Sequence, residues 1–493
     1  MRPAYPGGVT APGPVVGFDL DMTLVDTRAR ITASLRRTLA EAGISVTPEQ
    51  VWPFIGPPLA DTLTALAPGR EHAPLVARYR ALHDDPTTAP LTALPGAADA
   101  LAAVRAAGGR TVVVSAKVTR AVELVLRETG LAPLVDVAEG GRFATQKSEV
   151  LLAHGAGAYV GDHVGDVLAA RAAGAVAVGV ATGPPSPQDL SAAGADVVLP
   201  DLTSFGDWFA EHLLDHRLAA LDARLREIGS VLVAFSGGAD SALVLAAAAR
   251  ALGAANVVAA TAVSESLPPR ELAAARELAD HVGVRLVVPR TNEIEREGYR
   301  ANGGDRCFHC KAELLDTLGP VATQHGLAAV ATGTNADDVV AGFRPGIRAA
   351  GQRGAVTPLL DAALTKDQVR RASRRWGLPT WDKPASACLS SRVAFGVPIS
   401  APVLRRVGSA EEAVRDVLTG AGLAVGDLRV RDLGGSRARV ELAPATLAAA
   451  PDGVLDDALL AVRRCGFDAA EMDPRGFRSG SMNELLADPD AYR

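Results

Sequence analysis

Two aspartates directly follow an apolar run near the start of the chain. Asp19 and Asp21, separated by one residue, come after Val15–Phe18. If this run is a strand, both carboxylates lie at the carboxyl edge of a sheet, where open α/β sheets bind their ligands. One carboxylate could attack a phosphoryl group, while its neighbour protonates the leaving oxygen and later activates water. Taken alone, the pair fits a solvated strand end equally well.

Further groups of the same kind follow within the first 170 residues. Ser115 ends a second apolar run and offers a hydroxyl to a phosphoryl oxygen, and Lys147 supplies a positive charge. Asp162 and Asp166 follow a third apolar run, and with Asp19 they form a set of hard oxygen ligands such as Mg²⁺ prefers. These elements in this order predict a Mg²⁺-dependent phosphatase that works through an aspartyl phosphate.

A second candidate phosphate site follows the apolar run Val231–Phe235. The turn after this run reads SGGADS and leads into an Ala-rich segment that is expected to be helical. Its glycines let the backbone approach an anion closely, and a helix start supplies positive potential. Asp240 can hold the Mg²⁺ that accompanies pyrophosphate. The residues expected to line this phosphate site are Ser236, Gly237, Gly238, Asp240 and Ser241, together with Thr261 and Gly333 at the ends of later apolar runs.

Three of the four cysteines stand close to these motifs in the sequence. Cys307 and Cys310 form a CxxC pair, and Cys388 lies in a segment that ends at Arg392. By itself, a CxxC pair could be a redox couple, half of a zinc site or a pair without function. Cys465 has apolar surroundings and is expected to be a core thiol.

The first group of residues resembles the active site of the haloacid dehalogenase (HAD)-type phosphatases, over about residues 14–208. The resemblance implies that Asp19 is the nucleophile, that Asp21 is the acid and base, and that Ser115 and Lys147 bind phosphate. Residues 26–92 resemble the helical cap of the phosphoglycolate-phosphatase branch. Met22 replaces the glycine that is usual in this motif, which tightens the loop without removing a catalytic group. A degenerate domain that only binds or scaffolds is the alternative.

The SGGADS turn resembles the loop of the PP-loop ATP pyrophosphatases, which cleave ATP between the α- and β-phosphates. Other motifs extend the resemblance to the LarE family over about residues 217–493. They are RCFHCK (306–311), TGTNADD (332–338), FRPG (343–346), residues 382–392 and GFRSGSMN (476–483). Membership implies adenylation of a carboxylate of pyridinium-3,5-biscarboxylic acid mononucleotide. Sulfur then displaces AMP, a step in the synthesis of the nickel-pincer nucleotide cofactor. Ala341 and Gly342 depart from the family pattern, which has an acidic residue before the FRPG stretch.

The LarE resemblance also implies how sulfur and substrate are held. In family members that have a single cysteine, at the position of Cys388, that cysteine gives up its own sulfur. Where a CxxC accompanies it, the three thiolates hold a [4Fe–4S] cluster whose open iron carries the extra sulfide. Because Cys307 and Cys310 are present here, we expect the cluster. The residues that the resemblance implies for the substrate phosphate are Arg392, Arg429 and Arg431, with Glu411 as a further active-site carboxylate.

Apolar runs alternate with Ala-, Leu- and Arg-rich segments along most of the chain, which predicts an α/β fold with buried parallel strands. We predict a flexible tail (1–13), a HAD Rossmann-like domain with a helical cap (14–208) and a linker helix (209–228). A PP-loop α/β domain (229–396) and a small α+β domain for substrate binding or oligomerisation (397–493) complete the chain.

Composition limits the classes of function. A chain of 493 residues with 48% hydrophobic and 22% charged residues is globular and contains several domains. The net charge of −6 disfavours a nucleic-acid partner, and four cysteines are too few for a disulfide framework. We find neither a signal peptide nor a long apolar run. We therefore expect a cytoplasmic homo-oligomer that acts on a small-molecule nucleotide with Mg²⁺, ATP and a [4Fe–4S] cluster, without a membrane partner.

Two other functions remain compatible with the motifs. One is a PP-loop enzyme that thiolates tRNA, or thiolates or amidates another small molecule, although the pI of about 5.9 and the lack of a recognisable RNA-binding element disfavour tRNA. The other is an iron–sulfur sensor with vestigial ATP and phosphatase sites. A sensor has no need of the acidic residues or of the SGGADS turn, so their presence disfavours this alternative.

Overall fold

The computed structural model describes residues 13–340, 345–384 and 387–478. Nearly all of the predicted tail therefore lies outside the described residues. So do residues 341–344, which include part of FRPG, residues 385–386, and residues 479–483 of the last motif. The chain divides into two compact units between Leu213 and Leu214, within helix α10 (Phe205–Ile228). The boundaries predicted at residues 208, 228 and 396 stay predictions.

The first unit is built on a six-stranded parallel sheet in the order β5-β4-β1-β6-β7-β8. Alternate residues of a strand face opposite sides. Val113 and Val160 therefore pack on one face, and Val112 and Tyr159 pack on the other. Because β1 lies between β4 and β6, the residues that follow these three strands meet at one edge. The strands are β1 (Val15–Phe18), β4 (Arg110–Val114), β5 (Val137–Glu139), β6 (Ala158–Gly161), β7 (Val176–Val180) and β8 (Val197–Leu199).

Helices cover both faces of this sheet, as expected for buried parallel strands. The helices of the first face are α5 (Ala97–Ala106), α6 (Thr119–Glu128) and the start of α10, and those of the second are α7 (Lys147–His154), α8 (Val164–Ala172) and α9 (Pro187–Ala192).

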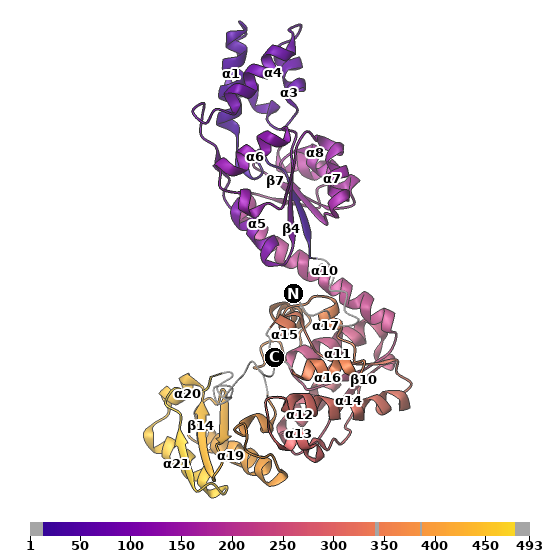
Figure 1. Ribbon diagram of the computed structural model, residues 1–493, viewed down its shortest axis with the longest axis vertical. Coiled ribbons are helices and arrows are strands. Elements are labelled where there is room, and N and C mark those ends of the chain that lie inside the picture. Colours follow the sequence, from indigo (N-terminus) through magenta and orange to yellow (C-terminus); the bar gives the residue numbers. More distant parts are fainter. Residues whose placement is uncertain (1–12, 341–344, 385–386, 479–493) are drawn as a thin grey trace. The chain divides into compact units, whose positions relative to one another are not determined.

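Four further helices form a cap with its own apolar core. They are α1 (Arg28–Glu41), α2 (Pro48–Val51), α3 (Leu59–Leu66) and α4 (His72–His83), and the paired strands β2 (Val25–Asp26) and β3 (Thr92–Ala93) flank them in sequence. Figure 1 shows α1, α3 and α4 together at one end of this unit, beyond the sheet. Met22, from the loop after β1, is fully buried in the core of the cap. Its φ of 59° explains why glycine is usual here, since other residues bear a strain of about 1–2 kcal/mol in this conformation.

The second unit begins with a parallel sheet in the order β11-β10-β9-β12. Val231 and Val233 face a core shared with α11, α12 and α18, whereas Leu232 faces α14. The strands are β9 (Val231–Ala234), β10 (Val257–Ala260), β11 (Arg285–Val287) and β12 (Ala329–Ala331). The helices are α11 (Ala239–Leu252), α12 (Pro269–Val282), α13 (Glu297–Arg300), α14 (Arg306–Gln324), α15 (Ala336–Val340), α16 (Pro345–Gln352), α17 (Pro358–Asp361) and α18 (Lys366–Arg375).

The same unit ends in a small three-stranded sheet with helices packed on it. β13 (Leu428–Asp432) pairs antiparallel with β14 (Arg437–Leu442), which pairs parallel with β15 (Ala469–Met472). Helices α19 (Ala401–Gly420) and α21 (Asp452–Arg464) share its core, with the short α20 (Pro444–Ala449) between the last two strands in sequence. Cys465 is half-buried and packs against this core.

The α/β class predicted from the sequence, with a Rossmann-like domain followed by a PP-loop-type domain, is confirmed. Within the described ranges, no helix combines the length and the apolar character needed to span a bilayer.

Candidate active sites

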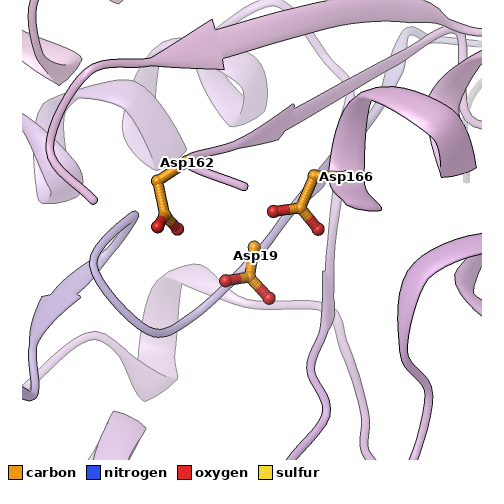
Figure 2. A group of neighbouring side chains, drawn as sticks. All are labelled: Asp19, Asp162 and Asp166. Atoms are coloured by element: carbon orange, nitrogen blue, oxygen red, sulfur yellow. The ribbon is translucent and has the colours of Figure 1, made fainter. Parts of the chain in front are cut away.

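Three aspartates converge at the carboxyl edge of the first sheet. Asp19 follows β1, Asp162 follows β6, and Asp166 lies in the first turn of α8. All three are buried, and each offers an oxygen within 4.8 Å of the other two. Figure 2 shows the three side chains close to one another. In the described part of the chain, no other three acidic, histidine or cysteine side chains meet in this way. Hard carboxylate oxygens at this spacing suit Mg²⁺.

Lys147 offsets part of this negative charge. Its Nζ lies 2.6 Å from Asp19 Oδ1, 2.7 Å from Asp166 Oδ1 and 3.0 Å from Tyr159 OH. Burial, opposed by Lys147, raises the pKa of Asp19 to about 7. Burial, reinforced by the neighbouring Asp19 and Asp166, also raises the pKa of Asp162. One ammonium among three buried carboxylates leaves an excess of negative charge that a divalent cation would offset.

Asp21 is paired with a lysine that the sequence analysis did not single out. Lys117 Nζ lies 2.7 Å from Asp21 Oδ1. Burial alone would raise the pKa of Asp21, but the charge and hydrogen bond of Lys117, together with smaller contributions from Thr27 and His83, lower this pKa. The buried Ser115 accepts a hydrogen bond at Oγ from the backbone N–H of Lys117, at 3.2 Å. Lys117 stands two residues after Ser115 at the same strand end, so the strand-end argument that found the serine could have found the lysine too.

The SGGADS turn joins β9 to α11 in the second unit. Gly237 has a φ of 69°, which glycine adopts without strain. The two serine Oγ atoms of the turn lie 3.1 Å apart, and Gly333 packs tightly against the turn, since a Cβ there would lie 2.8 Å from the backbone N of Ser241. A cavity of about 380 Å³ opens at the turn. Of the predicted ATP contacts it is lined by Ser236, Gly238, Asp240, Ser241, Thr261 and Gly333, but not by Gly237.

Two lysines that the sequence analysis missed also reach this turn. Lys366 Nζ lies 2.5 Å from Asp240 Oδ2, while Asn335 Nδ2 donates to Asp240 Oδ1 at 3.0 Å. Lys383 Nζ donates to the carbonyl oxygen of Gly237 at 3.1 Å. Both lysines therefore place an ammonium group at the phosphate-type loop, where Lys366 pairs with Asp240 and Lys383 pairs with Glu271. Lys366 lies 126 residues from Asp240, so no local pattern marks it, whereas Lys383 stands in the segment that also contains Cys388.

The three predicted cysteines meet at a second cavity, of about 490 Å³. Cys307 lies in the first turn of α14 and Cys310 begins its second turn, and Cys388 immediately precedes a short 3-10 helix. All three line this cavity, and Cys310 and Cys388 also line the cavity at the SGGADS turn. None of them forms a disulfide. Burial, together with the nearby Cys388, raises the pKa of the Cys310 thiol.

Buried polar side chains fasten the CxxC helix to the Cys388 segment. Arg306 Nη1 donates to the carbonyl oxygen of Ser390 at 2.9 Å and to Asn302 Oδ1 at 2.5 Å. Tyr299 OH also shares a hydrogen bond with Ser390 Oγ. These contacts hold two segments more than 80 residues apart in sequence side by side. The sequence analysis did not predict this role, although Arg306 opens the RCFHCK motif.

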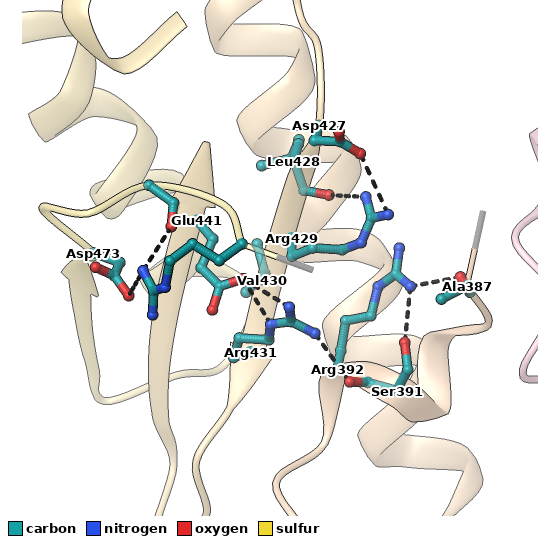
Figure 3. Close-up of polar contacts among 12 residues, drawn as sticks. Ala387, Ser391, Arg392, Asp427, Leu428, Arg429, Val430, Arg431, Glu441 and Asp473 are labelled. Carbon is teal, nitrogen blue, oxygen red and sulfur yellow. Dashed lines mark hydrogen bonds and ion pairs between the residues drawn. The ribbon is translucent and has the colours of Figure 1, made fainter. Parts of the chain in front are cut away.

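The three predicted arginines gather beside the Cys388 segment, as Figure 3 shows. Arg392, only 1% exposed, donates from Nε to Glu411 Oε1 at 2.8 Å and from Nη1 to the carbonyl oxygen of Ala387 at 2.5 Å. Burial and the neighbouring Arg392 guanidinium lower the pKa of Arg429 to about 10. The crowding of cations makes this a favourable place for an anion.

Arg431 completes the group on β13. It donates from Nη2 to Glu441 Oε2 at 2.7 Å and from Nη1 to the carbonyl oxygen of Ser391 at 3.0 Å. The structure thus brings Arg392, Arg429, Arg431 and Glu411 together. None of these four is among the described residues that line the two cavities of the cysteines.

Comparisons with known proteins agree with this division into two sites. The haloacid dehalogenase-like hydrolase family matches residues 16–180, and the asparagine synthase family matches residues 212–380. The chain is 31% identical to phosphoglycolate phosphatase of Rhodospirillum rubrum over 214 residues, which cover 39% of this chain and 88% of the relative.

Two relatives match the second unit over almost their whole length. An uncharacterized protein of Synechocystis, slr1717, is 40% identical over 275 residues, covering 56% of this chain and 99% of the relative. Pyridinium-3,5-bisthiocarboxylic acid mononucleotide synthase of Lactiplantibacillus plantarum is 33% identical over 275 residues, covering 54% of this chain and 94% of the relative. The resemblance predicted from the motifs is confirmed. The chain belongs to the LarE family over its second unit and carries a haloacid dehalogenase-like hydrolase domain in its first.

Proposed function

We propose that the second unit is an ATP-dependent sulfurtransferase that adenylates and then thiolates the carboxylates of pyridinium-3,5-biscarboxylic acid mononucleotide, a step of nickel-pincer nucleotide synthesis. The observation that carries the proposal is the shared cavity, since Cys310 and Cys388 line the same space as the SGGADS turn. An acyl-adenylate formed there would lie within reach of the sulfur, which lowers the barrier to transfer by proximity. The relative in Lactiplantibacillus plantarum is named for a product of this kind.

The residues of the turn have separate tasks in this reaction. The N-terminus of α11 and the backbone N–H groups of the turn face the phosphates that leave as pyrophosphate. Lys366 and Lys383 add positive charge, and Asp240 holds Mg²⁺ when ATP is bound. A substrate carboxylate attacks the α-phosphorus and pyrophosphate leaves. Sulfur then attacks the acyl carbon, and AMP leaves with the electrons of the broken C–O bond.

We further propose that Cys307, Cys310 and Cys388 bind a [4Fe–4S] cluster. Three cysteines that line one cavity without a disulfide fit three of the four irons and leave one iron open. When bound, the cluster supplies the sulfide that is transferred. Arg306 keeps the two cysteine segments at a fixed spacing through its bonds to Ser390 and Asn302.

The arginine cluster suits the phosphate of the mononucleotide. Arg392 and Arg431 are already bonded to Glu411 and Glu441, and they also hold the backbone around Cys388. Arg429 pairs with Asp427 and lies beside Arg392, and we assign the phosphate contact to these guanidinium groups together, because a bound dianion would offset the repulsion between them.

In the first unit we propose a Mg²⁺-dependent phosphatase. Asp19 attacks the phosphoryl group, Asp21 protonates the leaving oxygen and later activates water, and Ser115 and Lys147 hold phosphoryl oxygens. Asp19, Asp162 and Asp166 would hold Mg²⁺, which would supply positive charge next to the transferred phosphoryl group.

Substrate dependence of pyrophosphate release tests the sulfurtransferase. Anaerobically purified protein is incubated with ATP and one of three acceptors: pyridinium-3,5-biscarboxylic acid mononucleotide, nicotinamide mononucleotide or unmodified tRNA. We expect pyrophosphate only with the dicarboxylate, since nicotinamide mononucleotide has the same sugar phosphate without a free carboxylate. Release with tRNA alone would instead identify a tRNA-modifying PP-loop enzyme.

A further inference from the structure

The first unit contains a cavity of about 480 Å³ that the proposed phosphatase reaction leaves unexplained. Asp21 and Lys117 line it, so it opens onto the acid and base of the reaction. The other lining residues come from the cap, mainly from α1, α4 and the segment before α3, and from the start of α6. A volume of this size falls in the range of small-molecule sites. It therefore exceeds what a transferred phosphoryl group alone requires.

The walls of this cavity are largely apolar. Ile31, Leu35, Phe54, Val76 and Tyr79 contribute side chains from three different parts of the cap. Apolar walls stabilise a bound ligand mainly by covering apolar surface of that ligand. A two-carbon leaving group would leave most of these walls uncovered, and pyrophosphate would cover none of them favourably. The walls thus suit a leaving group that contains a ring.

One buried ring nitrogen in the wall lacks a hydrogen-bond partner among the described residues, although the other nitrogen of the same ring lies 3.8 Å from Asp84 Oδ1. His83 is 2% exposed, and its Nε2 finds no hydrogen-bond partner among the described residues. Burial, helped by the Lys117 ammonium, lowers the pKa of His83 to about 3, so the ring is neutral and can donate or accept a hydrogen bond. A buried polar atom without a partner is costly, and a hydroxyl of a ligand would satisfy it.

Charged groups complete the lining. Arg80 and Arg120 are exposed side chains in the wall, and Asp84 lies near Arg80 in sequence. Two guanidinium groups outnumber this carboxylate and favour an anionic group on the ligand, for which the fork of arginine suits a carboxylate.

We propose that the first unit hydrolyses a phosphate monoester whose leaving group combines a ring, hydroxyls and a carboxylate, namely a 5′-mononucleotide of a carboxylated aromatic base. The inference rests on the proposed phosphatase function. The P–O bond to the nucleoside breaks, the nucleoside leaves as an alcohol with a proton from Asp21, and water cleaves the aspartyl phosphate to inorganic phosphate. The LarE relative is named for a product that is also a mononucleotide with a ring. Both units would therefore act on mononucleotides with a carboxylated or thiocarboxylated ring.

Four commercially available compounds separate the contributions of ring and carboxylate. Nicotinate mononucleotide has both, nicotinamide mononucleotide has only the ring, phosphoglycolate has only the carboxylate, and pyrophosphate has neither. With the full chain and Mg²⁺, we expect kcat/KM to be highest for nicotinate mononucleotide, by about tenfold over nicotinamide mononucleotide, because one charge-assisted contact is lost. The same order should appear in the Kd values for the Asp19→Asn variant, measured by calorimetry.

Substitutions in the cavity wall test which side chains contact the carboxylate and the hydroxyls of the ligand. The double variant Arg80→Ala with Arg120→Ala should remove the preference for nicotinate over nicotinamide mononucleotide, by lowering kcat/KM for the nicotinate compound about tenfold more than for the nicotinamide compound. Arg70→Ala, an exposed arginine of the cap outside the cavity lining, is the matched control and should change neither. His83→Leu should weaken both mononucleotides but not phosphoglycolate.

A generic ester separates failure of this inference from failure of the phosphatase assignment. If p-nitrophenyl phosphate is hydrolysed but phosphoglycolate or pyrophosphate is the best of the four, or all four are equal, the inference is wrong and the phosphatase stands. A preference for pyrophosphate would instead point to removal of the by-product of the second unit. If the Mg²⁺-loaded protein hydrolyses no ester, both the phosphatase assignment and this inference are wrong.

Discussion

Asp19→Asn is expected to abolish Mg²⁺-dependent hydrolysis of p-nitrophenyl phosphate, with a loss of about 10⁴-fold or more in kcat, because an amide neither attacks phosphorus nor binds Mg²⁺ as a carboxylate does. Asp19 contacts Lys147 and shares an oxygen cluster with Asp162 and Asp166. Pyrophosphate release by the second unit should remain normal, since its site is built from other residues.

The control for this variant is Asp99→Asn, the same chemical change at an exposed position on α5. It should retain full phosphatase activity. Thermal unfolding of both variants establishes that the first unit is folded. Hydrolysis at the normal rate in folded Asp19→Asn protein would rule out the aspartate cluster as the phosphatase site.

Asp240→Ala is expected to lower ATP-dependent pyrophosphate release by about 10²–10³-fold, because loss of a Mg²⁺ ligand removes several kcal/mol of stabilisation from the leaving pyrophosphate. The change also leaves Lys366 and Asn335 without the carboxylate that they contact. Hydrolysis of p-nitrophenyl phosphate by the first unit should not change.

A matched control is Asp280→Ala, at an exposed position of α12 in the same unit. This variant should release pyrophosphate normally. If Asp240→Ala did so as well, ATP would have to bind somewhere other than the SGGADS turn.

The fold class could be predicted because the central strands are buried on both faces. Val231–Ala234 and Val176–Val180 are short, nearly continuous apolar runs bounded by turns, which is the sequence signature of such strands. The strands that escaped prediction are short. β5, β8 and β15 have three or four residues and are mostly half-buried or exposed, so they carry little apolar periodicity.

In the candidate sites, too, some residues could be predicted from the sequence and others could not. Asp19, Ser115 and Asp162 could be found because the carboxyl ends of neighbouring parallel strands always meet. Lys366 and His83 could not be found, because each reaches its site from a helix whose position depends on tertiary packing. For Arg392 the motif indicated a phosphate contact, and only the structure reveals its buried pairing with Glu411. The roles assigned to these residues stay predictions.

Mass spectrometry of product and protein after turnover tests the central claim, that sulfur transfer occurs at the cavity of Cys307, Cys310 and Cys388. Anaerobically purified, iron-containing protein with ATP and the dicarboxylate mononucleotide should yield the thiocarboxylate, and the mass of its polypeptide should not change. Cys388→Ser should release pyrophosphate yet form no thiocarboxylate. A loss of roughly 34 Da at Cys388, which corresponds to one H₂S removed by β-elimination, would show that Cys388 itself is the sulfur donor and that the cluster assignment is wrong. Thiocarboxylate formed equally well by Cys388→Ser, or pyrophosphate released by the wild-type chain without any thiocarboxylate, would contradict the account.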